Sequence, residues 1–167
     1  VFQINKHLGY GNISIIAKQL EEIYHQINLP TVLLPIGTAA RHEDHLPLSK
    51  VNKIIKTPAV LVDTQNIYDT MALIAFSNLY LGTSLHGAIT ALSYAVPHAG
   101  VTKKVQKLDV FLKTWGVRDY SKCIDIEEIS KETKELLKID RHTLIKKSQE
   151  LISLGYQNLN EIKKALS

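Results

Sequence analysis

The sequence LYLGTSLHGAITALSYAVP, residues 79–97, predicts a short buried strand, a polar turn and an apolar helix. Its first three residues are too few and too apolar for an exposed segment. Gly82 and Gly87 bracket the turn, where a backbone without side chains can approach a ligand closely. The helix that follows is apolar on nearly all sides, and Pro97 ends it. We therefore expect a strand-turn-helix unit whose polar turn is its main exposed part.

The turn leaves Thr83, Ser84 and His86 facing outward at the start of the helix. A helix N-terminus attracts anions, so two hydroxyls and an imidazole there indicate a phosphate or carboxylate site. Ser and Thr before a helix are also ordinary caps, and a single His is often a hydrogen-bonded spacer. On the turn alone, both interpretations stay open.

Outward from this unit, short apolar strands alternate with helices along the chain. The expected strands are residues 1–4, 31–36, 59–62, 79–81, 98–101 and 122–124. This alternation predicts a mostly parallel six-stranded sheet covered on both faces, which is a Rossmann-like α/β domain of three layers. We expect a single domain over residues 1–167, with 140–167 as a C-terminal helical extension that Gly155 interrupts.

Two polar turns follow strands that would be neighbours in the usual strand order 3-2-1-4-5-6. The first is the glycine-bearing segment 5–11, which we expect to be a loop after the first strand, and the second is the turn 82–87. Ligands of such sheets bind past the carboxyl ends of the strands at this switch point. Segment 5–11 lacks the third glycine of the dinucleotide fingerprint. Its position beside the second turn nevertheless favours a ligand site over simple capping.

Composition excludes several classes of function. The net charge is +4, and the lysines alternate with glutamates, which is typical of solvated helix faces and not of nucleic-acid binding. No apolar run is long enough to span a membrane. The one cysteine, Cys123, rules out an intrachain disulfide and is expected to be a buried thiol. The chain opens on a strand without an initiator Met, so we expect an N-terminal part to precede it.

The loop after the second strand, residues 37–46, is rich in charged side chains. It contains Arg41, His42, Glu43, Asp44 and His45. These residues are nearly contiguous and do not follow the spacing of zinc sites, so we expect no metal. A loop that faces a ligand at the end of a strand fits them better.

Several segments together resemble the C-terminal half of polysaccharide pyruvyl transferases. The most specific is GTSLHGAITAL at 82–92, followed by AVP at 95–97 and by Lys103 before an amphipathic helix. The segments FQIN at 2–5 and 35–44 fit the same pattern, and the resemblance covers most of residues 1–116. One residue departs from it: the family often has an Arg two residues before the His, where this chain has Ser84.

The resemblance implies two Rossmann-like domains that face each other across a cleft, as in GT-B glycosyltransferases. Such enzymes transfer a pyruvyl group from phosphoenolpyruvate to a sugar, forming a ketal in extracellular or surface polysaccharides. This chain would be the C-terminal domain, with its helical end packed toward the N-terminal half. Phosphoenolpyruvate as donor substrate, a saccharide acceptor and that N-terminal domain would be its partners, with no cofactor. The enzyme would be cytoplasmic, with at most peripheral contact with the inner face of the membrane.

By the same resemblance, His86 would act as general acid or electrostatic stabiliser. The donor-binding residues would be Thr83, Ser84, Gly87, Lys6, His7, Gly9, Gly11, Arg41, His42 and Lys103. Because Ser84 carries no charge, the positive charge would come from Arg41, Lys6 or Lys103.

Two other functions stay open at this point. In the first, the turn binds the diphosphate of a nucleotide sugar in a GT-B glycosyltransferase, with Asp109 or Asp125 holding the ribose. In the second, the chain is a non-catalytic sugar-binding or docking domain.

Overall fold

The computed structural model describes residues 1–40, 42–64, 66–102 and 104–166. Its centre is a six-stranded sheet, all parallel, in the order β3-β2-β1-β4-β5-β6. The strands are β1 (Phe2–Gln3), β2 (Thr31–Leu33), β3 (Ala59–Leu61), β4 (Tyr80–Gly82), β5 (His98–Val101) and β6 (Cys123–Ile124). The predicted strand order is confirmed, and β1 and β4 are neighbours at the switch point.

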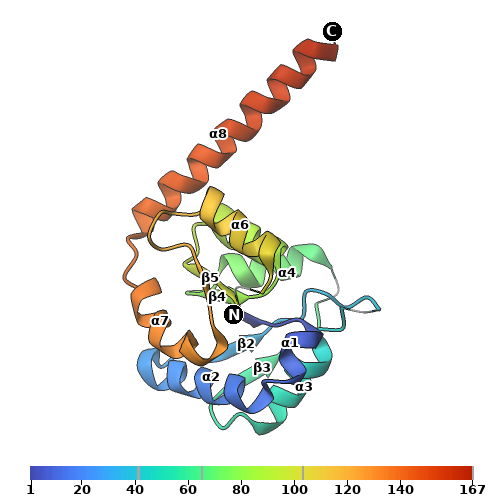
Figure 1. The fold of residues 1–167 in the computed structure, drawn as a ribbon, viewed down its shortest axis with the longest axis vertical. Helices are drawn as coiled ribbons and strands as arrows, with labels where there is room; N and C mark the ends of the chain where they lie inside the picture. Colours follow the sequence, from blue (N-terminus) through green and yellow to red (C-terminus); the bar gives the residue numbers. More distant parts are fainter. Residues whose placement is uncertain (41, 65, 103, 167) are drawn as a thin grey trace.

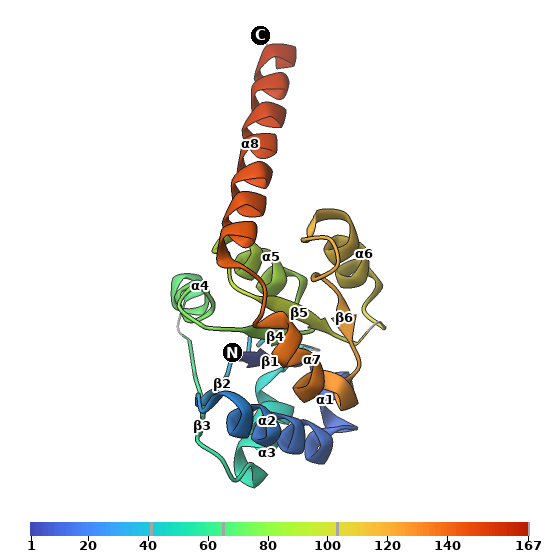
Figure 2. The ribbon, with the colours of Figure 1, turned by 90° about the vertical axis from the view of Figure 1, so that its left-hand side faces the viewer.

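Helices cover both faces of this sheet. They are α1 (Lys6–Tyr10), α2 (Ile13–Ile27), α3 (His45–Ile54), α4 (Ile67–Ala75), α5 (Leu85–Ser93), α6 (Gln106–Trp115), α7 (Ile129–Leu136) and α8 (Arg141–Leu166), with a 3-10 turn, η1 (Ile126–Glu128), before α7. Figures 1 and 2 show α4, α5 and α6 on one side of the strands and α1, α2, α3 and α7 on the other. The three-layer α/β prediction is confirmed.

The core consists of two apolar clusters, one on each face of the sheet. Phe2, Leu33 and Leu81 belong to the cluster under α2, whereas Tyr80 belongs to the one under α5. Leu81 on β4 and Leu92 on α5 are each 2% exposed, so the predicted buried strand and the apolar helix both lie in the core. The apolar helix α5 is thus held by burial of its own side chains, at about 25 cal/mol for each Å² removed from water.

The segment after β1 differs from the prediction of a loop. Residues 6–10 form the short helix α1, because the Asn5 carboxamide oxygen accepts a hydrogen bond from Leu8 N at 3.0 Å and caps it. Asn12, the N-cap residue of α2, makes no side-chain cap bond and donates from Nδ2 to the Leu8 carbonyl at 2.9 Å. The additional cap at Asn5 therefore converts the glycine segment into a helix.

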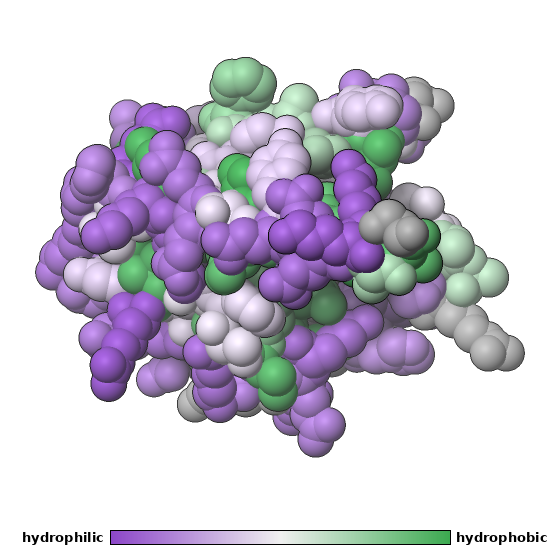
Figure 3. Space-filling view, turned by 90° about the horizontal axis from the view of Figure 1, so that it is seen from above, coloured by the Kyte–Doolittle hydropathy of each residue, from purple (hydrophilic) through white to green (hydrophobic). Residues whose placement is uncertain are grey.

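The C-terminal end is one helix and not two. α8 runs through Gly155, since a single glycine costs a helix only about 1 kcal/mol and its neighbours favour helix. Its first turns touch the domain, where Ser148 Oγ donates to the Ser93 carbonyl at 2.7 Å, and the rest projects away from it (Figure 1). Polar side chains cover most of the side from which it projects (Figure 3).

The loop after β2 is shorter than the predicted 37–46, because α3 begins at His45. Asp125 makes no side-chain cap bond, and η1 precedes α7 there. Although α8 has 26 residues, neither it nor any other described helix is apolar enough over sufficient length to cross a membrane.

Candidate functional site

The start of α5 lies at the carboxyl end of β4, beside the end of β1. Ser84 is the N-cap residue, and its Oγ accepts a hydrogen bond from Gly87 N at 3.2 Å. The N–H groups of Leu85 and His86 lie in the first turn, where no intrahelical acceptor exists for them. The His86 side chain is exposed and Ser84 is partly exposed. The first turn therefore presents hydrogen-bond donors and an imidazole to solvent.

Gln3 organises the inner part of the turn. Its side chain is 2% exposed, and its Oε1 accepts hydrogen bonds from Thr83 N at 2.8 Å and Ser84 N at 2.9 Å. Thr83 Oγ1 also donates to this oxygen, at 3.2 Å, and accepts from Asn5 N at 2.9 Å. The Thr83 hydroxyl and the two inner N–H groups are thus already occupied. The groups that stay open to an anion are the Ser84 hydroxyl, the N–H groups of Leu85 and His86, and the His86 imidazole.

The other end of Gln3 reaches the loop after β2. Its Nε2 donates to Asp44 Oδ2 at 2.7 Å, and the same oxygen accepts from Gly37 N at 2.8 Å and Ile36 N at 3.3 Å. Burial raises the pKa of the Asp44 carboxyl, and the hydrogen bond from Gly37 N opposes this. Asp44, Gln3 and Thr83 form one network, which we call the switch-point clamp. It ties together the carboxyl ends of β1, β2 and β4.

Among the described lysines and arginines, Lys6 is the closest in sequence to the switch-point clamp. Its ammonium group forms an ion pair. Its Nζ donates to Glu43 Oε2, and this hydrogen bond raises the pKa of the Lys6 ammonium. The pair joins α1 to the loop after β2, beside Asp44. Lys6 therefore serves first as a link between two segments of the switch point, and its charge is largely balanced by Glu43.

A buried tyrosine explains the two glycines of the turn. Tyr80 is fully buried, and among the described residues its hydroxyl has no hydrogen-bond partner. A Cβ atom at Gly82 or at Gly87 would overlap this hydroxyl. Burial, with a smaller effect of the nearby Asp44 charge, raises the pKa of Tyr80. Gly82 and Gly87 are thus required by packing.

The other predicted donor-binding residues are distributed over several places. Gly9 is buried, with Pro47 where its side chain would be. Gly11 lines a separate groove with Tyr10 and Lys50. His7 and His42 are exposed, while Arg41 and Lys103 lie outside the described residues. Of the two glycines of segment 5–11, Gly9 thus has a packing role and Gly11 lines the separate groove.

The residues considered for the alternative functions have other contacts. Asp109 forms an ion pair with Lys113 one turn along α6, at 2.6 Å. Asp125 is exposed next to η1. Within the described ranges, no group of three or more His, Cys, Asp or Glu side chains is placed to hold a metal ion.

Sequence reasoning did not assign a role to Gln3, Asp44 or Tyr80. One signal was available: Gln3 is a polar residue between Phe2 and Ile4 in a buried strand, and a buried amide requires partners. Which partners it finds depends on the tertiary fold, since Asp44 and Thr83 are far from it in the sequence.

The fold and the site define a class: a Rossmann-like α/β domain that presents a helix N-terminus and a histidine at the switch point of its sheet. The family model "Polysaccharide pyruvyl transferase" matches residues 12–103, more than half of the chain, and this match includes the turn at 82–87. The chain belongs to the polysaccharide pyruvyl transferase family. No curated protein and no solved structure matches it.

Proposed function

We propose that this chain binds the donor phosphoenolpyruvate at the start of α5 and takes part in the transfer of its pyruvyl group to a saccharide acceptor, with release of phosphate. The observation that carries the proposal is the exposed first turn of α5 at the switch point. Ser84, the N–H groups of Leu85 and His86, and the His86 imidazole are available there to an anion. Family membership supports the reaction class.

The proposed reaction forms a cyclic ketal. One sugar hydroxyl adds to C2 of phosphoenolpyruvate while the methylene carbon takes up a proton, and a second hydroxyl on the sugar then displaces the phosphate. The step needs a proton donor and groups that stabilise the departing phosphate. Histidine exchanges protons near neutral pH, so His86 is suited to the first role or to stabilising the phosphate. The helix start is suited to holding the anion.

The switch-point clamp would keep this site rigid. Gln3 fixes Thr83 and Ser84, and through them the direction of the first turn of α5. We infer that Gln3 is a positioning residue, because it holds the turn without facing the ligand. We also propose that a second, N-terminal domain faces this site across a cleft, as in a GT-B enzyme, and binds the saccharide acceptor. The enzyme would act in the cytoplasm.

The first experiment tests binding to this chain. Titration with phosphoenolpyruvate, followed by ¹H–¹⁵N NMR, should shift the amide signals of Leu85 and His86. His25, an exposed histidine on α2, provides a matched control, and its amide should not move. Shifts confined to other segments would contradict the proposed site.

The second experiment tests transfer in the enzyme that includes its N-terminal half. His86→Ala should lower phosphate release from phosphoenolpyruvate by about 10²-fold or more, whereas His25→Ala should leave it unchanged. Turnover of nucleotide sugars without consumption of phosphoenolpyruvate would favour a glycosyltransferase. Turnover of neither, with a broad acceptor panel, would favour a binding domain.

Ser84 gives a third arm, because the family often has an Arg there. Ser84→Arg removes the N-cap of α5 and should reduce stability by about 1 kcal/mol. If the turn holds the donor, the added charge should nonetheless tighten phosphoenolpyruvate binding. Ser84→Ala removes the same cap without adding charge and is the matched control. Weaker binding in both variants would argue against an anion at this turn.

A further inference from the structure

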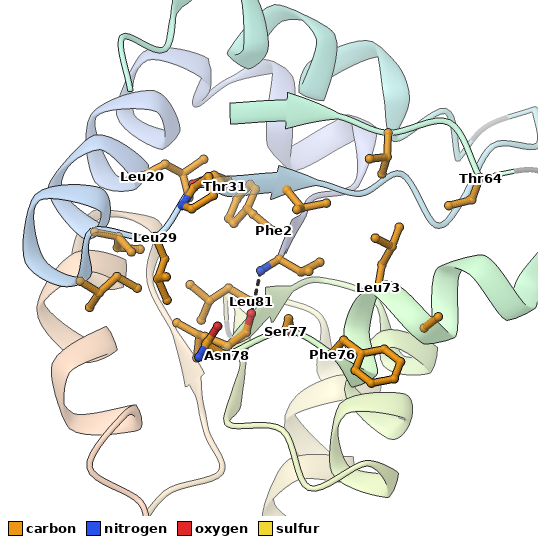
Figure 4. A pocket seen from close by; sticks show the side chains of 18 of the residues that line it. Phe2, Leu20, Leu29, Thr31, Thr64, Leu73, Phe76, Ser77, Asn78 and Leu81 are labelled. Atoms are coloured by element: carbon orange, nitrogen blue, oxygen red, sulfur yellow. Dashed lines mark hydrogen bonds between the residues drawn. The ribbon is translucent and has the colours of Figure 1, made fainter. Parts of the chain in front are cut away.

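A groove of about 770 Å³ opens at the amino ends of the central strands (Figure 4). Most of its lining is apolar. Leu20 and Ile23 of α2 contribute from the core cluster on one face of the sheet, and Val62 and Leu73 contribute from the cluster on the other. Because its walls come from both faces, the groove passes through the plane of the sheet.

The passage lies between β2 and β4, ahead of Val1. Phe2 of β1 pairs with Leu33 on β2 and with Leu81 on β4, so β1 separates these two strands. Two strand spacings amount to about 10 Å. If the same register continues, the position before Val1 falls opposite Thr31 and Leu79. Both of these residues line the groove, which therefore has the width and the borders of one missing strand segment.

Val1 already makes the hydrogen bonds of a strand residue. Its nitrogen donates to the Leu79 carbonyl at 2.7 Å, the dashed line in Figure 4, and its carbonyl accepts from Leu81 N at 3.0 Å. An amide N–H would serve the first of these bonds equally well. Burial lowers the pKa of the Val1 amino group from 8.0 to about 5, since the apolar surroundings solvate an ammonium group poorly. The position suits a peptide nitrogen better than a charged terminus.

We propose that the polypeptide segment immediately before Val1 binds in this groove. It adds two residues to β1 and closes the gap between β2 and β4. Side chains alternate between the faces of a strand. Phe2 faces the α2 cluster and Val1 the opposite one. The residue before Val1 therefore faces Leu20 and Ile23, and the residue before that faces the side of the sheet that α4 covers. β-Branched apolar side chains fit this setting best.

The test compares three versions of the chain, preceded by Val-Val, Gly-Gly or Asp-Asp. The Val-Val version should have the highest midpoint of urea unfolding, and the Asp-Asp version the lowest. In the Val-Val version, nuclear Overhauser contacts should join the added residues to Thr31 and Leu79. These contacts report the position of the segment even if the midpoints change little.

A wall variant and a matched control sharpen the test. Leu29 is 39% exposed and lines this groove, whereas Ile54 is 45% exposed and lines the separate groove near Gly11. Leu29→Ser should reduce the gain of Val-Val over Gly-Gly, and Ile54→Ser should not. Equal midpoints without contacts to Thr31 and Leu79 would overturn the proposal. So would dimerisation of the chain through this groove that persists in the Val-Val version, because a second copy would then be the occupant.

Discussion

Removing the charge from the Val1 amino group should change how the stability of this chain depends on pH. The group lies in the groove between β2 and β4, and its pKa falls from 8.0 in the unfolded chain to about 5 in the folded one. Between these values the unfolded state binds a proton that the folded state does not. Folding is therefore favoured as the pH rises and disfavoured as it falls.

The magnitude follows from the shift. Each pKa unit corresponds to about 1.36 kcal/mol, so the full effect is about 4 kcal/mol. This loss of stability is nearly absent above pH 8, reaches about 2 kcal/mol at pH 6 relative to pH 8, and has its full value below pH 5. An acetyl group on Val1 removes the charge while keeping an N–H to donate to the Leu79 carbonyl. The acetylated chain should therefore lack this loss of stability.

Urea unfolding of the free and acetylated chains at pH 8, 7, 6 and 5.5 measures the effect. Other groups also titrate in this range, among them His98, whose pKa burial lowers, but they contribute equally to both chains. The difference between the two free energies of unfolding isolates the amino group. Parallel curves for the two chains would refute the reasoning that burial in the groove opposes its charge.

Two further predictions concern the switch point. Gly87→Ala places a methyl group against the buried Tyr80 hydroxyl and should destabilise the fold by about 1–3 kcal/mol in urea unfolding. At Gly155 the added Cβ meets nothing within 4 Å beyond its chain neighbours and the nearby backbone of its own helix, so Gly155→Ala should stabilise α8 by up to about 1 kcal/mol. Equal effects of the two substitutions would contradict the packing role of Gly87. Gln3→Leu leaves the Thr83 and Ser84 N–H groups without their acceptor and removes one of the donors to Asp44 Oδ2, so it should lower the free energy of unfolding by about 3 kcal/mol. Unchanged amide exchange at Thr83 and Ser84 in this variant would show that the clamp does not hold the turn.

Much of the fold is determined locally, and the sequence alone was sufficient for it. Strands such as β5, His98–Val101, are short apolar runs between helices, and their alternation implies a parallel sheet. The order 3-2-1-4-5-6 follows from the connections that such sheets favour. The turn between β4 and α5 was visible because its glycines, Ser84 and Pro97 are local signals.

The tertiary structure decided what the polar residues do. Gln3 meets Asp44 and Thr83 across separations of 41 and 80 residues, and no local pattern encodes such partners. Gly9 looked like part of a ligand loop, but Pro47 occupies the space beside it, so its role is packing. The sequence determined by itself where the strands, most of the helices and the polar turn lie, because hydrophobic periodicity and capping act between near neighbours, although it predicted neither α1 nor the unbroken α8. Only the folded structure decided which donors stay open to a ligand, because that depends on which distant side chains reach them first.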